Sequence, residues 1–254
     1  MMITIPVTPC RRPASVPGNR LKSLCRRCLA FCVLLCAAAH GGEMLVLSER
    51  LQHYTEVKYG AAANLRVAQW RALVVENAAR PAPEKLDIVN RFINRIPYVS
   101  DQTNWGVPDY WATPYELLAV NGGDCEDYAI AKYFSLLEMG VAAEQLQMLF
   151  VLTGERLEPH IVLAYQPADK IDPLILDNLS AAIEPLSQRH DLSPLYAFNP
   201  AGLWHTGGAG RAGKIGRPER IAQWMDLLIR INREIRRGDV ATVTTPAAGL
   251  RALR

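Results

Sequence analysis

The spacing of apolar residues predicts that the first half of the chain is helical. Residues 48–79 contain no proline and carry apolar side chains at helical intervals, which predicts one long helix. A second helix is expected from about Glu84 until Pro97 stops it, and a third from Asp124 to Met139. The predicted buried face of the first helix is Leu65, Ala68, Ala72, Val75 and Ala79.

Between the second and third helices, residues 98–123 are rich in Trp, Pro and Gly and predict a long structured loop with a short helix. After the third helix the apolar period changes to two, which predicts strands over 147–152, 160–166 and 174–178. The last two strands are joined by a turn-rich segment, as in a hairpin. Residues 207–217 are Gly-rich and indicate a flexible loop before a final helix. Helices followed by antiparallel strands predict an α+β fold.

Charge is concentrated at the N-terminal end of the chain. The 254 residues have a net charge of +3, but residues 1–39 carry six basic and no acidic side chains. Positions 40–254 therefore hold 22 basic and 25 acidic residues, a net charge of −3. Binding to nucleic acid requires a basic surface, so this mildly acidic body argues against a nucleic-acid partner.

Residues 1–39 have the pattern of an export signal. Arg26 and Arg27 precede 12 apolar residues that end in three alanines, a run too short to span a membrane comfortably. We expect residues 1–39 to be a signal peptide cleaved near Ala39 or, if uncleaved, an N-terminal anchor. Five of the six cysteines lie in this segment. Two of them form a C-x-x-C pair, but no βαβ pattern surrounds it, so a redox or zinc role is not expected.

Cys125 is the one cysteine beyond the leader, and it opens the third predicted helix. Helix N–H groups and the helix dipole stabilise a thiolate there, so Cys125 is either a candidate nucleophile or merely a small buried residue. Asp124, Glu126 and Asp127 would repel a thiolate, and a hard cation such as Ca²⁺ would relieve that repulsion. The alternative is that Asp124 caps the helix and the other two acids face water.

His160 and Asp177 are the candidate partners of this thiol. Histidine at the start of an apolar strand is commonly a capped or half-exposed residue, but His160 is the histidine best placed to act as a base. A hairpin that turns around residues 168–169 sets position 177 opposite or diagonal to position 160. Asp177 would then orient the imidazole, with Asn178 as the alternative, while Asp172 lies in the turn.

Four segments make the chain similar to a known family: Trp105–Glu116, Gly123–Phe134, His160–Tyr165 and Leu174–Asn178. Over about residues 45–235 the chain resembles the bacterial transglutaminase-like cysteine proteinases, in particular the periplasmic type that releases biofilm adhesins. The resemblance implies a transglutaminase-like (papain-like) α+β fold for a protease domain over residues 40–240. Residues 241–254 carry no clear pattern and are expected to form a frayed C-terminal tail.

The resemblance also implies roles for individual residues. It makes Cys125 the nucleophile, His160 the general base and Asp177 the residue that orients it, and it implies a calcium site formed by Asp124, Glu126 and Asp127. The implied activity is calcium-dependent cleavage of the N-terminal region of a large surface adhesin at a pair of small residues, typically Ala-Ala, which controls adhesin release and biofilm dispersal. The implied regulator is an inner-membrane receptor for cyclic di-GMP.

Other functions suit parts of the same sequence. The same three residues support amine transfer by a transglutaminase, and a non-catalytic calcium-dependent binding module would keep the fold without the chemistry. An intact Cys, His and Asp set argues against the binding module. Gly208–Lys214 spells most of a phosphate-binding loop, but Ile215 stands where Ser or Thr is required, so nucleotide binding is not expected.

Overall fold

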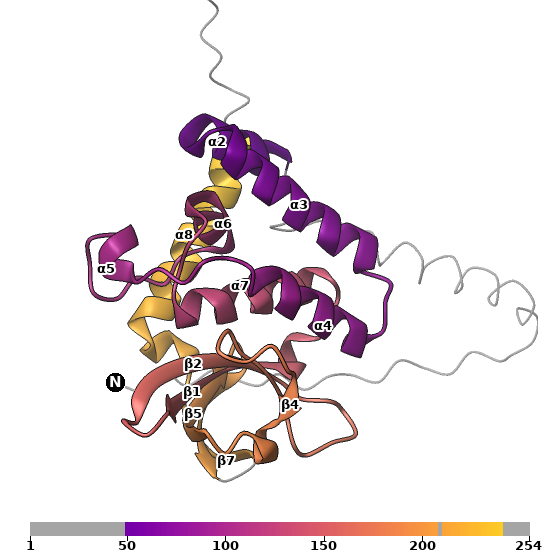
Figure 1. Cartoon of the computed structure of the whole chain (residues 1–254), viewed down its shortest axis with the longest axis vertical. Helices are drawn as coiled ribbons and strands as arrows, with labels where there is room; N and C mark the ends of the chain where they lie inside the picture. The colour runs from indigo at the N-terminus through magenta and orange to yellow at the C-terminus, as the bar shows by residue number, and fades with distance from the viewer. Residues whose placement is uncertain (1–48, 208–209, 241–254) are drawn as a thin grey trace, which may run out of the picture. The chain divides into compact units, whose positions relative to one another are not determined.

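The computed structural model describes residues 49–207 and 210–240, so the predicted leader and tail lie outside the described part. A layer of helices covers one face of a seven-stranded antiparallel sheet with the strand order β4-β3-β2-β1-β5-β6-β7 (Figure 1). This is the α+β architecture that the sequence predicts. Among residues 49–207 and 210–240, no helix is both long and apolar enough to cross a membrane.

The elements follow one another in the order helices, strands, helix. The helices are α2 (Glu49–Tyr59), α3 (Ala61–Asn77), α4 (Ala82–Ile93), α5 (Asp101–Asn104), α6 (Pro114–Val120), α7 (Cys125–Glu138) and α8 (Ala222–Val240). The strands are β1 (Leu146–Thr153), β2 (Glu158–Tyr165), β3 (Leu174–Leu176), β4 (Glu184–Pro185), β5 (Leu192–Asn199), β6 (Gly202–Gly207) and β7 (Gly210–Gly216). Three short 3₁₀ turns complete the order: η2 (Ala143–Gln145), η3 (Leu186–Gln188) and η4 (Pro218–Arg220).

The helix predicted over residues 48–79 is in fact two helices, α2 and α3. They are separated by Gly60, whose φ of 89° is in the left-handed region that glycine adopts without strain. The predicted buried face is also wrong, because Leu65 and Val75 are exposed. Trp70 sets the true face: it is fully buried and its Nε1 donates to Ser135 Oγ of α7 at 2.7 Å. The residues that α3 buries are Ala63, Val67, Trp70 and Val74.

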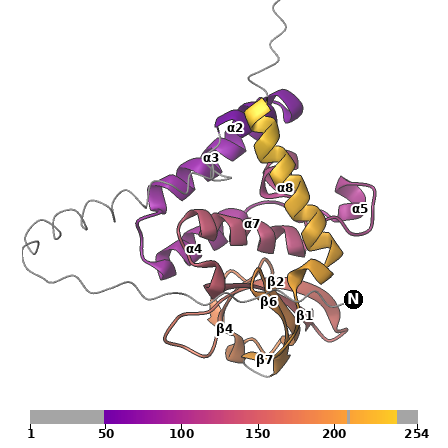
Figure 2. The same cartoon turned by 180° about the vertical axis from the view of Figure 1, so that it is seen from behind.

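Helix α7 is the centre of the helical layer. It packs against α3, α4 and α6 on one side and against β1 and β2 on the other, as both ribbon views show (Figure 2). Its end is as predicted: Gly140 has a φ of 83°, and its N–H donates to Leu137 O at 2.8 Å. Because α7 is held on both sides, its first residue occupies a fixed position above the sheet.

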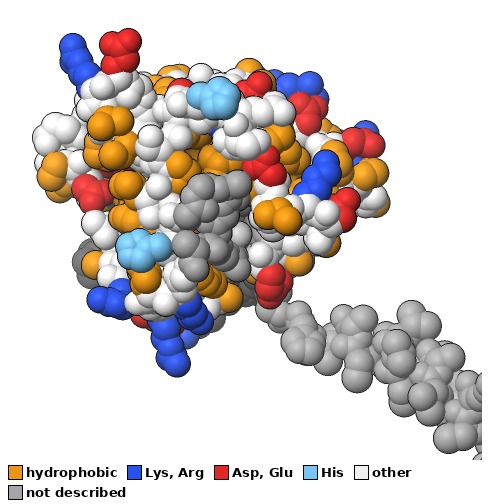
Figure 3. Space-filling model, turned by 90° about the horizontal axis from the view of Figure 1, so that it is seen from below, with side chains coloured by type: hydrophobic (Ala, Val, Ile, Leu, Met, Phe, Trp, Pro, Cys, Tyr) orange, Lys and Arg blue, Asp and Glu red, His pale blue; other side chains and the backbone are white. Residues whose placement is uncertain are grey.

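The sheet buries side chains on both faces. Alternate residues such as Ile161 and Leu163 join the core under the helices, while Val162 and Ala164 join a second apolar cluster on the other face. The surface seen from below carries hydrophobic side chains among scattered charged ones (Figure 3). The flexible loop predicted over 207–217 is wrong, because β7 pairs with β6 there.

Candidate active site

Cys125 is the first residue of α7, and the loop before it is tightly packed. A Cβ at Gly123 would lie 2.5 Å from Asp127 Oδ2 and 2.6 Å from Leu117 Cδ1, so only glycine fits. The N–H of Val99 donates to the carbonyl of Gly123 at 2.9 Å and ties the loop to the segment before α5. The half-buried thiol is therefore presented by a backbone that has little freedom to shift.

His160 and Asp177 are brought together by the β2–β3 hairpin. Leu163 pairs with Leu176, so position 177 lies diagonal to position 160, just beyond the last paired residue of β3. His160 Nε2 is 2.8 Å from Asp177 Oδ1, and both side chains are buried. The contact is made by Asp177, whereas Asp172 lies at the surface and accepts from Ser187. The other ring nitrogen, Nδ1, is left for a third group.

Cys125 and His160 line the same cavity, which has a volume of about 250 Å³. Three aromatic rings, those of Trp111, Phe150 and Tyr196, line the same cavity. The thiol donates to Glu126 Oε2 at 3.1 Å, so its hydrogen-bond partner here is a carboxylate and not the imidazole. The three predicted residues therefore lie together: Cys125 and His160 line the cavity, and Asp177 contacts His160. Glu126 lies beside the thiol.

The surroundings of the thiol hold it in its protonated form. Burial raises the pKa of Cys125 far above its ordinary value, and the charge of Glu126 and the hydrogen bond to it raise this pKa further. The backbone N–H of Ile161, the residue after His160, acts in the opposite direction. A thiol with these neighbours becomes a nucleophile only if the negative charge of Glu126 is offset.

Glu126 belongs to a cluster of five carboxylates that form two overlapping groups. In each group one oxygen per residue lies within 4.8 Å of the others, and Asp101 is common to both. Burial, with repulsion from Asp124 among the lesser causes, raises the pKa of Asp101 to about 6 and that of Glu126 to about 8. The groups are Asp101, Asp124 and Asp127, and Asp101, Asp109 and Glu126.

The cluster fits a hard cation. Asp101 Oδ1 and Asp124 Oδ1 are both buried without a hydrogen-bond partner in the described part of the chain, and oxygen atoms of this kind are the ligands that Ca²⁺ prefers. Asp127 is less available, because its two oxygens accept from the N–H groups of Ala112 and Asp124 at 2.7 and 3.3 Å. The geometry therefore adds Asp101 to the predicted acids. Asp101 carries no local sequence signal, since only the tertiary fold brings α5 beside the start of α7.

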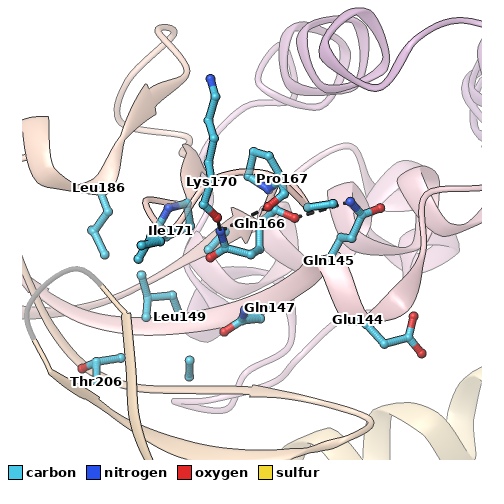
Figure 4. A pocket seen from close by; sticks show the side chains of 14 residues that line it. Glu144, Gln145, Gln147, Leu149, Gln166, Pro167, Lys170, Ile171, Leu186 and Thr206 are labelled. Carbon is cyan, nitrogen blue, oxygen red and sulfur yellow. Dashed lines mark hydrogen bonds between the residues drawn. The ribbon is translucent and has the colours of Figure 1, made fainter.

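A larger cavity, of about 480 Å³, lies on the opposite face of the sheet (Figure 4). Three of its six polar lining side chains are carboxamides, and Gln145 Nε2 donates to the carbonyl of Gln166 at 3.4 Å. Neither a thiol nor an imidazole lines it, so it lacks the groups that nucleophilic catalysis requires. The smaller cavity beside Cys125 is the candidate active site.

Comparisons with known proteins show the family and the fold of the chain. Residues 63–191 match the family model of the bacterial transglutaminase-like cysteine proteinases. A solved structure of Legionella pneumophila LapG is similar at 33% identity and a TM-score of 0.63, covering 72% of this chain and 97% of that one.

Two further structures of the same Legionella protein are similar over 72% of this chain. The EGTA-treated form is 34% identical with a TM-score of 0.64 over 97% of its own length, and the calcium-bound form is 33% identical with a TM-score of 0.63 over 98%. No curated protein matches the chain.

Proposed function

The chain belongs to the bacterial transglutaminase-like cysteine proteinases, and on that premise we propose that it is a calcium-dependent endopeptidase of the LapG type with Cys125 as its nucleophile. Membership of the family supports a protease with a protein substrate. The observation that carries the finer proposal is that Cys125, at the start of α7, and His160, which is bonded to Asp177, line one cavity. Thiol, imidazole and carboxylate in this order are the groups of a cysteine protease.

The first half of the reaction forms a thioester. Cys125 Sγ attacks the scissile carbonyl carbon while its proton passes to His160 Nδ1. The tetrahedral intermediate then collapses, the C–N bond breaks and the imidazolium returns the proton to the leaving amine. Asp177 accepts the hydrogen bond from Nε2 throughout, which fixes the ring and stabilises its charged form.

The second half hydrolyses the thioester. A water molecule takes the place of the departed amine, gives a proton to His160 and attacks the acyl carbon. The C–S bond breaks, the proton returns to sulfur and the new carboxyl terminus leaves. The same residues therefore serve both steps, and the enzyme ends as it began.

Calcium is the proposed cofactor, and Asp101 and Asp124 are its most available ligands, with Asp109, Glu126 and Asp127 beside them. Bound there, a divalent cation would supply positive charge next to Glu126, the group that opposes ionisation of the thiol. The similarity to the calcium-bound structure of Legionella pneumophila LapG supports this choice of ion.

The proposed substrate is the N-terminal region of a large surface adhesin, cut between two small residues of the Ala-Ala type. A cavity of about 250 Å³ lined by Trp111, Phe150 and Tyr196 supports small side chains next to the scissile bond. Phe150 and Tyr196 are paired across β1 and β5 and stack with ring centroids 4.3 Å apart, so they form one continuous aromatic wall. Release of the adhesin would then control biofilm dispersal.

The proposed location is the periplasm, and the proposed regulator is an inner-membrane receptor for cyclic di-GMP. The location follows from the resemblance and from the apolar run that ends at Ala39, and the regulator follows from the resemblance alone. N-terminal sequencing of material from a periplasmic extract tests the first proposal: a mature chain starting near His40 supports cleavage. Recovery of the intact leader in the membrane fraction would instead show an anchor.

One assay tests the activity. The purified chain is incubated with N-terminal adhesin fragments, with and without EGTA, in the presence of a fluorescent primary amine. We expect cleavage that EGTA prevents, a new N-terminus within the small-residue pair and no incorporation of the amine. A fragment in which that pair is changed to Leu-Leu is the matched control and should stay intact. Amine incorporation without cleavage would show a transglutaminase instead.

A further inference from the structure

Asp177 lies beyond the hydrogen-bonded part of its strand, so the sheet does not hold it in place. β3 ends at Leu176, and no ladder partner faces the next residue. The backbone carbonyl of Asp177 instead accepts from Asn94 Nδ2 at the end of α4, at 2.7 Å. That contact fixes the backbone but leaves the carboxylate to be oriented by its own partners.

Three donors orient the carboxylate of Asp177. Oδ1 is 2.8 Å from His160 Nε2 and accepts from the N–H of Leu179 at 3.0 Å. Oδ2 accepts from Arg189 Nη2 at 2.7 Å. Both oxygens are thus engaged, and the guanidinium approaches the oxygen that the imidazole does not use.

The guanidinium of Arg189 is itself held in place by further hydrogen bonds. Its side chain is buried, and it forms two further hydrogen bonds with Asp191, from Nε at 2.9 Å and from Nη2 at 2.7 Å. Asp191 is half-exposed, so the guanidinium bridges an inner carboxylate and an outer one. This fork geometry is what an arginine can make and a lysine cannot.

A second basic group, Lys132 of α7, lies in the electrostatic field of Asp177. It shares a helix face with Cys125, two turns further along, and its Nζ is buried without a hydrogen-bond partner among the described residues. Burial lowers the pKa of Lys132 to about 7, with Asp177 raising it in part. Arg189 is therefore the permanent cation beside Asp177.

We propose that Arg189 is a positioning residue of the active site, which keeps Asp177 ionised and its carboxylate turned toward His160. Burial alone would raise the pKa of Asp177, but the hydrogen bonds from His160, Leu179 and Arg189 hold it below its usual range. Without the guanidinium, Oδ2 would be buried with no donor and the carboxylate would rotate or take up a proton. The inference rests on the proposed function but concerns a residue outside the Cys-His-Asp set.

Alkylation of Cys125 by iodoacetamide tests the proposal without any substrate. Labelling is followed by peptide mapping, which separates Cys125 from the cysteines of residues 1–39, at pH 7 and pH 10 in calcium buffer. We expect Arg189→Met to slow labelling at least tenfold at pH 7 and to leave it unchanged at pH 10, where hydroxide removes the thiol proton in place of the imidazole. A role in folding or access alone would change both rates equally.

Two further variants complete the test. Arg189→Lys keeps the charge without the fork and should label at an intermediate rate at pH 7. Arg80→Met removes an exposed arginine after α3 that pairs with Glu84, and it should label like the unaltered chain. If Arg189→Met does not fold, a slower rate for Arg189→Lys at pH 7 alone still supports the proposal.

Equal rates for the unaltered chain and every folded Arg189 variant at both pH values would overturn the proposal, as would an equal loss at both. The cleavage assay is separate. Cleavage by the unaltered chain together with unchanged labelling in the variants would refute the role of Arg189 alone. Absence of cleavage would refute the proposed function and leave the labelling result standing.

Discussion

At the scale of single residues, the site depends on which oxygen of which carboxylate reaches His160. Asp177 and Asp172 are five positions apart, yet the first is buried against the imidazole and the second is bonded to Ser187 at the surface. The same side chain in the two places therefore has different consequences. In the proposed mechanism Asp177 orients the general base, whereas Asp172 only bonds to Ser187.

We predict that Asp177→Asn lowers kcat/KM on the order of 10³–10⁴-fold, because an amide at this position favours the wrong imidazole tautomer and no longer stabilises the imidazolium. Asp172→Asn is the matched control and should lower it less than about threefold. Steady-state kinetics on a cleaved adhesin fragment measures both. Equal, small losses would mean that another group orients His160.

The residue pairs that sequence could predict are those close along the chain. The strands around His160 and Asp177 are joined by one short turn. Hairpin geometry therefore places the two residues at diagonal positions on neighbouring strands. Asp101 is different, because it meets Asp124 only after α5 folds back onto the start of α7. Nothing in the sequence near Asp101 marks such a contact. Arg189 likewise reaches Asp177 through a turn whose path the sequence does not specify.

At the scale of elements, the start of α7 is where the site concentrates buried carboxylates. Buried acids with raised pKa values crowd against its first turn, and two of their oxygens have no hydrogen-bond partner in the described part of the chain. A bound cation stabilises the charged form of each of these carboxylates. Without a cation, burial and mutual repulsion oppose their ionisation.

We predict that EGTA lowers both the melting temperature and the rate of cleavage, and that Ca²⁺ restores both better than Mg²⁺, whose smaller octahedral shell suits this cluster poorly. Calorimetric titration of Ca²⁺ into chelator-treated protein should show one binding event. Asp101→Asn should weaken that binding at least tenfold, whereas Asp226→Asn, at an exposed position on α8, should leave it unchanged. Full activity in EGTA, together with no measurable heat of Ca²⁺ binding, would contradict the prediction and leave the acids with a role in helix capping only.

Elements with strong apolar periodicity were predictable, and those without it were not. α4 and α7 carry clear stripes, and both lie where the sequence places them. β6 and β7 are short, glycine-rich and polar, so their sequence indicates a loop, although backbone pairing makes them a hairpin. Register and pairing are tertiary properties, and local pattern informs them weakly.

At the scale of the whole molecule, α8 ties the end of the described chain to its beginning. It packs against α2, and Arg230 pairs with Glu116 of α6 at 2.6 Å. Next to this pair, Glu234 Oε1 accepts from Thr113 Oγ1 at 2.9 Å, while Oε2 is buried without a partner among the described residues. Burial, then repulsion from Glu116, raises the pKa of Glu234 to about 8.

This raised pKa predicts how stability depends on pH. In the unfolded chain Glu234 loses its proton near its ordinary pKa of about 4.3, whereas in the folded chain it keeps the proton until pH is about 8. The folded state binds the extra proton in this window, so Glu234 makes stability fall as pH rises through it. Scanning calorimetry from about pH 5 to about pH 8 should show a smaller fall in melting temperature for Glu234→Gln. The exposed Glu219→Gln should match the unaltered chain, and a Glu234→Gln curve identical to both would contradict the prediction.

The central claim is that Cys125 is the nucleophile of a protease, and the most direct measurement compares the unaltered chain with Cys125→Ala in the adhesin-fragment assay. Both proteins should have the same melting temperature within about 2 °C, because the half-buried thiol adds little to the core. The unaltered chain should cut the fragment at its small-residue pair, and acid-quenched samples should carry an acyl adduct that peptide mapping assigns to Cys125. Cys125→Ala should show neither cleavage nor adduct. Cleavage of the same fragment by Cys125→Ala would contradict the account.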